Sequence, residues 1–273
     1  MDFENVVFRA RDKIATITLN SPQNFNAISE ELLMELGNVL DHCADDESVQ
    51  VIVIRGEGRV FCSGADIRSL KKGMDDKDSQ KLLRIVRAAS NVGRKIRSIR
   101  KPVIASLHGA VAATGCGIVL LCDFKVAADD VLFIEAFLNI GLIPDMGYTY
   151  TLGRYIGFGR LTEYLMLSKL LTVDKAYEMG LVNVVTTKEN LENETMALAK
   201  KLVALPHDAV ALTKTLINQT VFQGFDQCLD REIKYQDLLS RSENFTEGVN
   251  AFLEKRPAVF NKQDLQNSGG GAS

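Results

Sequence analysis

The sequence predicts an α/β protein, with a β/α core up to about residue 195 and a helical part after it. Short apolar runs that are typical of buried strands, such as Val51–Ile54 and Val103–Leu107, alternate with apolar residues at helical spacing in the first part. From about Gly147 onward the spacing is mainly helical, with Leu181–Val185 as a short β-like run. The 273 residues supply a continuous core for one large domain or two modest ones.

The composition describes an ordinary globular protein, with 46% hydrophobic and 25% charged residues. The net charge of −3 argues against a nucleic-acid-binding surface. Five cysteines without a C-x-x-C pair are typical of reduced thiols in a cytosol-like compartment. Residues 1–11 lack the apolar run of a secretory signal, and no apolar stretch reaches the roughly 18–20 residues that span a bilayer. We therefore expect a soluble, cytoplasmic protein without a metal, whose partners are small molecules or copies of itself.

The amino-terminal part begins with two short strands, Val6–Phe8 and Ile14–Leu19, joined by a polar turn. Residues 20–24 then break regular structure, and Ser29 is expected to cap a helix that has acidic residues in its first turn. The apolar face of this helix consists of Leu32, Leu33, Leu36, Val39, Leu40 and Cys43.

Strands and helices alternate after that helix. The expected strands are Val51–Ile54, Val60–Phe61, Val103–Leu107, Phe124–Ala128 and Leu132–Ile134, and the expected helices cover about 82–99 and 118–121. We therefore predict a core at 1–195 that binds the substrate, a helical carboxy-terminal region at 196–262 and a disordered tail at 263–273.

A first glycine bend, at residues 61–66, follows an apolar run. Gly64 permits a positive φ or the close approach of another molecule, and the backbone N–H groups of such a bend are free to point outward. The alternative is an ordinary strand-to-helix connection, in which Ser63 or Asp66 only caps the helix.

A second glycine bend, at residues 108–117, follows the strand at 103–107. Small residues at a helix amino terminus expose unpaired N–H groups at the positive end of the helix dipole, which favours an anion. Two such bends could converge on one oxyanion. Gly115 and Gly117 also imitate a dinucleotide-binding motif, but Leu120 stands at the third glycine position and Asp129 lies nearer than the usual ~20 residues. A nicotinamide cofactor is therefore not favoured.

Motifs across nearly the whole chain carry a family resemblance. They are residues 19–22 (LNSP), 26–27 (NA), 61–67 (FCSGADI), 101–105 (KPVIA), 108–109 (HG), 122–123 (CD), 141–145 (GLIPD), 247–248 (EG), 251–252 (AF) and 254–256 (EKR). In this order and spacing the sequence resembles the crotonase (enoyl-CoA hydratase/isomerase) superfamily. The resemblance implies a spiral of ββα turns, a helical trimerisation region and a homotrimer or a dimer of trimers.

The resemblance also implies that a thioester carbonyl lies between two backbone N–H groups, which here belong to Ala65 and Thr114. The family usually has glycine or alanine at the second position. The Thr114 methyl and hydroxyl groups must therefore find room beside the acyl group, although the backbone donor itself is kept.

The substrate positions that the resemblance implies are Asn24, Phe25, Ser63, Gly64, Asp66, Ile67, Gly115, Phe137, Phe252 and Lys255. Backbone near Asn24 and at Asp66 holds the CoA nucleotide in the family, and Gln23 replaces a lysine that is common there. Phe252 and Lys255 match positions that reach the nucleotide end of a neighbouring subunit's ligand. Coenzyme A is part of the acyl-CoA substrate, so no separate cofactor is expected.

The residues at the family's acid–base positions favour isomerisation. Hydratases of the family use two glutamates, and this chain has Gly117 and Phe137 at the matching positions, which cannot move a proton. Asp145 resembles the acid of isomerase-type members, and apolar neighbours would raise the pKa of its carboxyl group. Asp145 is expected to take the α-proton of a 3-enoyl-CoA and to return it at the γ-carbon.

Other roles stay open for several of these residues. Asp145 could only cap a helix, and Glu135 is a second candidate acid. His108 is expected to be a hydrogen-bonded structural histidine, and no nucleophile-elbow pattern supports a triad of Ser63, His108 and an acid. The alternative functions are an enoyl-CoA hydratase/dehydratase, a CoA-ester hydrolase, and a non-catalytic acyl-CoA-binding subunit. The acyl group and the choice between trimer and hexamer stay open.

Overall fold

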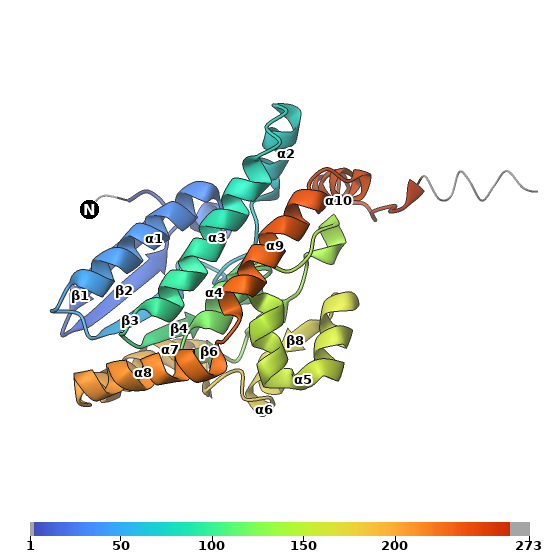
Figure 1. The fold of residues 1–273 in the computed structure, drawn as a ribbon. Coiled ribbons are helices and arrows are strands. Elements are labelled where there is room, and N and C mark those ends of the chain that lie inside the picture. Colours follow the sequence, from blue (N-terminus) through green and yellow to red (C-terminus); the bar gives the residue numbers. More distant parts are fainter. Residues whose placement is uncertain (1–2, 263–273) are drawn as a thin grey trace, which may run out of the picture.

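A mainly parallel sheet flanked by helices forms the centre of the molecule in the computed structural model, which describes residues 3–262 (Figure 1). The strands are β1 (Val6–Arg11), β2 (Ile14–Leu19), β3 (Val51–Gly56), β4 (Val103–Leu107), β5 (Ala110–Ala112), β6 (Phe124–Ala128), β7 (Leu132–Ile134), β8 (Leu170–Thr172) and β9 (Val184–Thr186). The helices are α1 (Glu30–Asp45), α2 (Ile67–Asp75), α3 (Lys81–Ser98), α4 (Thr114–Leu121), α5 (Tyr148–Met166), α6 (Val173–Glu178), α7 (Leu191–Val203), α8 (His207–Val221), α9 (Phe225–Leu239) and α10 (Glu243–Leu253). Three 3-10 turns, η1 (Pro22–Asn24), η2 (Leu138–Ile140) and η3 (Lys188–Asn190), lie between them. The predicted α/β class is confirmed.

The main sheet has six strands in the order β1-β2-β3-β4-β6-β9. β1 and β2 form an antiparallel hairpin, and the other neighbours are parallel, with Ile14 opposite Val51 and Ile52 opposite Val103. Strand β4 is buried along its whole length, which explains its mainly apolar sequence. Its one polar residue, Ser106, shares a hydrogen bond with the Thr195 hydroxyl (2.9 Å).

The segment at residues 60–66 is irregular, so the strand expected at Val60–Phe61 is wrong. The Phe61 N–H donates to the His108 carbonyl (2.9 Å), and Cys62 makes only an isolated bridge with Val111. A single bridge beside a turn does not extend into a ladder. The segment therefore runs alongside the bend between β4 and β5, while β5, β7 and β8 form a second sheet of three strands.

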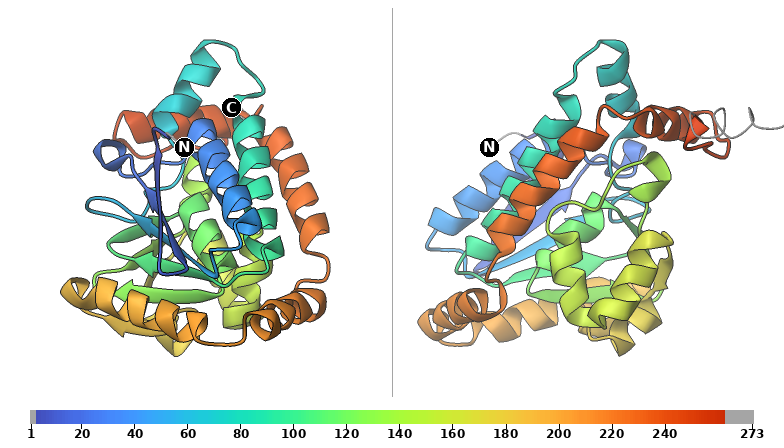
Figure 2. Two further views of the ribbon diagram at one scale, coloured as in Figure 1. Left: turned by 90° about the vertical axis from the view of Figure 1, so that its left-hand side faces the viewer. Right: turned by 45° about the vertical axis from the view of Figure 1, so that its right-hand side comes forward.

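Helices cover the main sheet in layers. α1, α3 and α9 lie side by side on one face (Figure 2), and α7 packs against β3, β4 and β6 from the other side. The predicted cap of α1 is confirmed, because Ser29 Oγ accepts a hydrogen bond from the Leu32 N–H (3.1 Å). The six apolar residues predicted for its inner face are buried.

Helix α7 crosses the proposed boundary at residue 195 and packs on the sheet, so the division into a core and a helical region stays a prediction. The tail expected at 263–273 lies outside the described residues. Among residues 3–262, no helix combines the length and the apolar character that crossing a bilayer requires.

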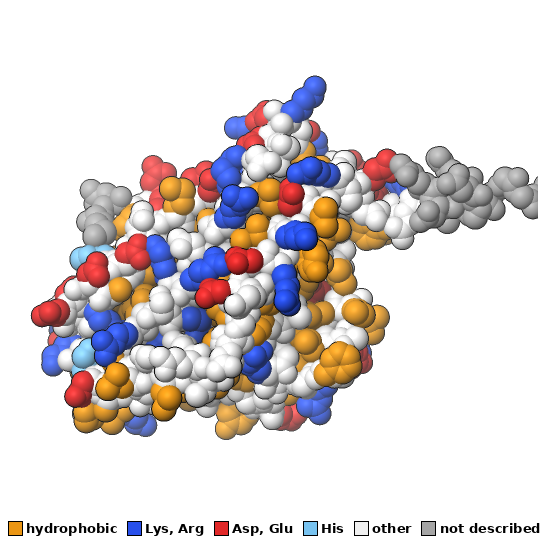
Figure 3. Space-filling model, viewed as in Figure 1, with side chains coloured by type: hydrophobic (Ala, Val, Ile, Leu, Met, Phe, Trp, Pro, Cys, Tyr) orange, Lys and Arg blue, Asp and Glu red, His pale blue; other side chains and the backbone are white. Residues whose placement is uncertain are grey.

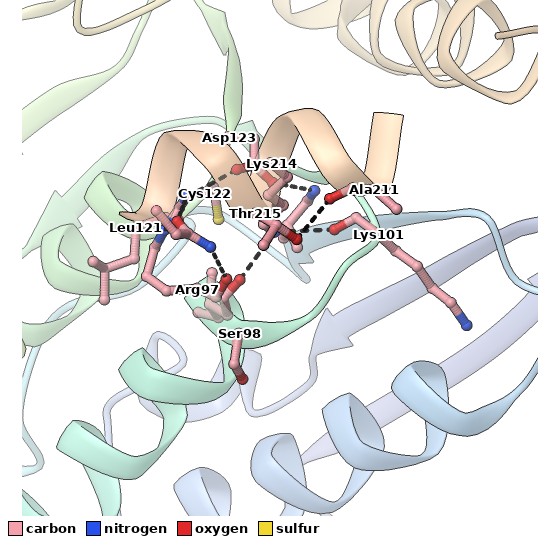
Figure 4. A network of polar contacts seen from close by, with 12 residues as sticks. Arg97, Ser98, Lys101, Leu121, Cys122, Asp123, Ala211, Lys214 and Thr215 are labelled. Atoms are coloured by element: carbon pink, nitrogen blue, oxygen red, sulfur yellow. Dashed lines mark hydrogen bonds and ion pairs between the residues drawn. The ribbon is translucent and has the colours of Figure 1, made fainter. Parts of the chain in front are cut away.

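A buried ionic network fixes α8 to the centre of the molecule (Figure 4). Arg97 of α3 donates through Nη1 to Asp123 Oδ1 (2.9 Å), and Lys214 of α8 places Nζ 2.7 Å from Asp123 Oδ2. The same Oδ2 accepts the Val103 N–H at the start of β4 (2.8 Å). Both cations are more than nine-tenths buried, so this one carboxylate neutralises charge that would otherwise be costly to bury.

Candidate active site

A cavity of about 410 Å³ opens between the two glycine bends, α2, η2 and α10. The predicted site residues that line it are Asn24, Phe25, Ser63, Ala65, Asp66, Ile67, Thr114, Phe137, Asp145, Phe252 and Lys255. Gly64 and Gly115, the other two predicted residues, lie behind this lining and shape the bends. Residues far apart in the sequence thus meet around one hollow.

The first glycine bend presents a free backbone N–H to this cavity. The Ile28 N–H donates to the Gly64 carbonyl (2.7 Å), and the Asp66 N–H donates to the Ile28 carbonyl (3.0 Å). The Ala65 N–H lies between these two bonds, so it points away from Ile28, and it has no acceptor among residues 3–262. Gly64 has a φ of 88°, which glycine adopts without strain.

Asp66 also caps a helix, as the simpler interpretation of the first bend proposed. Its Oδ1 accepts the Ser69 N–H (3.0 Å) at the start of α2, and its Oδ2 accepts a hydrogen bond from Asn24 Nδ2 (3.1 Å). Because one side chain fixes both α2 and the η1 turn, it also fixes the backbone of the bend between them.

The second glycine bend presents another free N–H, at the first residue of α4. Ala113 precedes the helix with φ 45° and ψ −119°, a conformation that is unusual for a residue with a side chain. Its N–H donates to the Ile134 carbonyl (2.9 Å), which anchors the bend to β7. Thr114 begins the helix, and its N–H has no acceptor among residues 3–262 and lies at the positive end of the helix dipole.

The two bends are in direct contact. A Cβ atom added at Gly64 would lie 3.0 Å from the Ala113 Cβ, and one added at Gly115 would lie 2.8 Å from the Cys62 side chain. Glycine is therefore needed at both positions for the bends to approach each other. Ala65 and Thr114, which both line the cavity, therefore belong to two bends that pack against each other.

Asp145 lies in the same cavity and is buried, with only 4% of its surface exposed. Its Oδ2 is 3.5 Å from the Thr114 hydroxyl, and its Oδ1 has no hydrogen-bond partner in the described part of the chain. Burial, together with the nearby Glu232 carboxylate, raises the pKa of Asp145 to about 8, and the Thr114 hydroxyl opposes this shift. Perturbed carboxyl groups of this kind are typical of proton-transfer sites.

The capping role considered for Asp145 is not observed. Helix α5 begins at Tyr148 with Gly147 as its cap residue, and no side chain caps it. Only the backbone carbonyl of Asp145 takes part, by accepting the Tyr148 N–H (3.0 Å). The Asp145 carboxylate is therefore not used as a helix cap, and the residue lines the cavity.

The positions of the hydratase glutamates hold no acid, and the first of them, Gly117, has no room for a side chain. A Cβ atom added at Gly117 would lie 2.8 Å from the Met146 Cβ. Phe137 lines the cavity and packs edge-on against Tyr148, with 6.0 Å between the ring centres. This wall of the cavity is therefore apolar.

Two further candidate residues, Glu135 and His108, lie outside the cavity lining. Glu135 is buried, and its Oε1 accepts the Phe137 N–H (3.1 Å); burial raises the pKa of this carboxyl group as well. His108 contacts the Gly58 carbonyl through Nε2 (3.0 Å), and burial lowers its pKa, as expected of a structural histidine. Ser63 makes no hydrogen bond with His108, so the triad is not formed.

The outer part of the cavity is more exposed and carries cations. Phe25 and Phe252 are largely exposed, and Lys255 of the same chain lies beside them. Arg68, which the sequence interpretation missed, also lines the cavity, and among residues 3–262 it forms no ion pair. The sequence signal that could have identified Arg68 is its position directly after Asp66 and Ile67, two of the predicted substrate positions. Arg68 and Lys255 therefore bring positive charge to this outer part of the cavity.

No group of three histidine, cysteine, aspartate or glutamate side chains is placed to hold a metal ion in the part of the chain that the structure describes. The expectation that the protein works without a cofactor other than the substrate's own coenzyme A stays a prediction.

Comparisons with known proteins agree on one family. A family model described as enoyl-CoA hydratase/isomerase matches residues 9–263. The trans-2-decenoyl-[acyl-carrier-protein] isomerase of Streptococcus mutans is 33% identical, over 95% of this chain and 99% of that protein. The 1,2-epoxyphenylacetyl-CoA isomerase of Escherichia coli is 31% identical (94% and 98% covered), and the crotonyl-CoA hydratase of Syntrophomonas wolfei is 30% identical (95% and 99%).

Solved structures show the same fold. The crystal structure of an enoyl-CoA hydratase from Mycobacterium avium subsp. paratuberculosis superposes with a TM-score of 0.87 at 29% identity. The match covers 95% of this chain and 100% of that one. The predicted fold is therefore confirmed, whereas the trimerisation expected of its helical region stays a prediction.

Proposed function

The chain belongs to the enoyl-CoA hydratase/isomerase (crotonase) family, and from this premise we propose that it is an isomerase that converts a 3-enoyl thioester into the 2-enoyl isomer. The observation that carries this proposal is the carboxyl group of Asp145. It is buried in the cavity with one oxygen free, while Gly117 and Phe137 replace the pair of acids that hydration would use.

In this proposal the thioester carbonyl oxygen accepts hydrogen bonds from the N–H groups of Ala65 and Thr114. Asp145 removes a proton from the α-carbon, and the electrons of that C–H bond delocalise onto the carbonyl oxygen as an enolate. Each backbone donor stabilises this oxyanion by roughly 3 kcal/mol, because it is fixed before the charge develops. The proton then returns from Asp145 to the γ-carbon, and the double bond moves into conjugation with the carbonyl.

The environment of Asp145 suits both steps. A base that must first accept a proton and then release it works best when its pKa is close to the working pH. Burial raises the pKa of Asp145 to about 8, so near neutral pH the carboxyl group exchanges readily between its two forms.

The substrate is proposed to be an acyl-CoA thioester, with Arg68 and Lys255 near its phosphates. The relative from Streptococcus mutans is named for an acyl-carrier-protein thioester, which presents the same kind of thioester carbonyl. Coenzyme A and the carrier protein are therefore both included in the test below.

A hydratase is the second candidate, because relatives of this chain with about the same identity are named hydratases. It would need an acid other than the two that this chain lacks. Glu135 is buried, but it lies outside the cavity lining, which makes this candidate the weaker one.

A homotrimer or a dimer of trimers is proposed as the assembly. Exposed apolar side chains support a further contact surface, with Phe158 and Met166 on α5 and Leu212 and Leu216 on α8 each more than half exposed. Figure 3 shows hydrophobic side chains gathered at the right-hand edge, over α5. The mass of the native protein by light scattering tests the assembly, and a monomer at micromolar concentration would exclude it.

The test of the function is a panel of 2-enoyl and 3-enoyl thioesters, carried by coenzyme A and by acyl carrier protein, followed by ultraviolet absorbance. An isomerase generates conjugation from the 3-enoyl substrate and leaves most of the 2-enoyl substrate conjugated. Loss of conjugation from the 2-enoyl substrate would indicate a hydratase, and release of free thiol a hydrolase. Binding of the thioesters without any turnover would indicate a binding subunit.

A further inference from the structure

Two buried polar side chains of α9 hold the backbone on either side of Asp145. Glu232 accepts the Gly147 N–H through Oε2 (2.9 Å), and Gln236 donates from Nε2 to the Ile143 carbonyl (2.7 Å). The two side chains are four residues apart, so they project from the same face of the helix. Their partners are the second residue before Asp145 and the second residue after it.

Both side chains are unusual choices for a buried helix face. Gln236 has no exposed surface and Glu232 has 5%, and the Gln236 Oε1 has no hydrogen-bond partner among residues 3–262. Burying such groups costs free energy that leucine at the same positions would not cost. A role at the loop that carries Asp145 accounts for their presence.

The loop itself needs to be held. Met146 and Gly147 both have positive φ values, 59° and 70°, and Met146 is a non-glycine residue in this region. Such a conformation persists only where surrounding contacts over-determine it. The hydrogen bond from the Gly147 N–H to Glu232 is one of those contacts, because Gly147 directly follows Met146 in the chain.

Glu232 also acts on Asp145 through its charge. Burial raises the pKa of Glu232 to about 7, and the bonds from Gly147 and Cys228 oppose this shift. On Asp145, burial has the largest effect, the Glu232 carboxylate adds to it, and Thr114 of α4 acts in the opposite direction. The groups that face the two carboxyl groups are thus Thr114 of α4, Cys228 of α9 and the Gly147 N–H of the loop.

We propose that Glu232 and Gln236 are positioning residues that clamp the Asp145 loop, so that helix α9 takes part in orienting the base for proton transfer. This rests on the proposed isomerase function. The clamp holds the carboxylate toward the cavity and beside the Thr114 hydroxyl, and a misplacement of about 1 Å would be enough to slow the transfer roughly 100-fold.

Three variants and a control test the clamp. Glu232→Gln keeps an acceptor for Gly147 and removes the charge, whereas Glu232→Leu and Gln236→Leu remove the hydrogen bonds. Asp230→Asn, an exposed acid on the same helix that pairs with Arg94, is the control. For each protein the kcat and KM for the 3-enoyl thioester, the pH profile of kcat/KM and the melting temperature are measured.

The leucine variants are expected to lose roughly 10- to 100-fold in kcat with KM within about threefold of wild type. Glu232→Gln is expected to keep most of the wild-type kcat, because it keeps an acceptor for Gly147. The acidic limb of its pH profile of kcat/KM is expected to move to lower pH by about one unit, because the negative charge beside Asp145 is gone. Asp230→Asn should match the wild type. A folded Glu232→Leu or Gln236→Leu protein with wild-type kcat would overturn the clamp.

A second readout separates the clamp from the function. Titration of the Asp145 carboxyl group by ¹³C NMR, assigned with Asp145→Asn, needs no turnover and no leucine variant. Wild-type protein that converts no thioester while Glu232→Gln still shifts this titration to lower pH would refute the isomerase function alone. Turnover by the wild type together with a wild-type kcat in a folded Glu232→Leu protein would refute the clamp alone.

Discussion

The hydroxyl of Thr114 lies 3.5 Å from the Oδ2 atom of Asp145, and the backbone N–H of the same threonine is unpaired at the start of α4. One residue therefore contacts the proposed base with its side chain and offers an oxyanion donor with its backbone. The Thr114 hydroxyl, for which the sequence left the surroundings open, is turned toward Asp145.

Thr114→Val separates these two contributions. The backbone donor stays, but the hydrogen bond that lowers the pKa of Asp145 is lost, so this pKa rises. Because the reaction starts from the deprotonated carboxylate, the acidic limb of kcat/KM should move to higher pH, with a loss of about two- to tenfold at pH 7. Thr114→Ser keeps the hydroxyl and should behave like the wild type. A limb that moves to lower pH in the valine variant would contradict this role.

Gly64→Ala tests the contact between the two bends. The added Cβ would meet the Ala113 Cβ at 3.0 Å, at a φ of 88° that alanine disfavours. We expect a loss of about 1–3 kcal/mol in the free energy of unfolding and a loss of roughly 10- to 100-fold in kcat, because the Ala65 N–H shifts. Urea denaturation and thioester turnover measure these effects. Gly159→Ala in α5 is the control, since its added Cβ meets nothing within 4 Å, and it should leave kcat unchanged without lowering the free energy of unfolding.

Asp145→Asn should stabilise the protein at alkaline pH. The pKa of Asp145 is about 8 in the folded protein against an ordinary 3.8, so the folded state holds a proton that the unfolded chain releases between these values. The associated stability is complete below about pH 4 and is lost as the pH rises through 8. The asparagine variant avoids this loss. Its gain in unfolding free energy, from urea denaturation, should grow from about zero at pH 4 to a few kcal/mol at pH 8. A gain that is the same at both pH values would refute the burial effect.

Asp123→Ala should be among the most destabilising substitutions on this chain. It leaves the buried cations Arg97 and Lys214 without their shared carboxylate, which costs about 3–5 kcal/mol of unfolding free energy. Asp226→Ala removes a partner of Arg94 at the surface and should cost less than about 1 kcal/mol. Similar denaturation midpoints for the two variants would show that the network contributes little.

The features that were predicted correctly are those that depend on residues close together in the sequence. Glycines and small residues mark both bends, apolar periodicity marks α1, and a short, mainly apolar run marks β4. Asp145 was identified because it follows a proline in a recognisable run. That the Asp145 carboxylate does not cap α5 was not predicted, because it depends on Gly147 being the cap residue of that helix.

The features that were missed depend on contacts between distant residues. Glu232 bonds to a residue 85 positions away and Gln236 to one 93 positions away, so spacing along the chain carries no trace of the clamp. Val60–Phe61 looked like a strand because it is apolar. Its burial instead comes from packing beside the β4–β5 bend, where Phe61 bonds to the His108 carbonyl.

The turnover of a 3-enoyl-CoA by Asp145→Asn is the most direct measurement of the central role given to this carboxyl group. The amide has a similar shape but cannot accept the α-proton, so kcat should fall by about 10²- to 10⁴-fold. Binding of the thioester, measured by calorimetry, should stay within a few-fold of wild type. Turnover close to the wild-type rate would contradict the proposed mechanism.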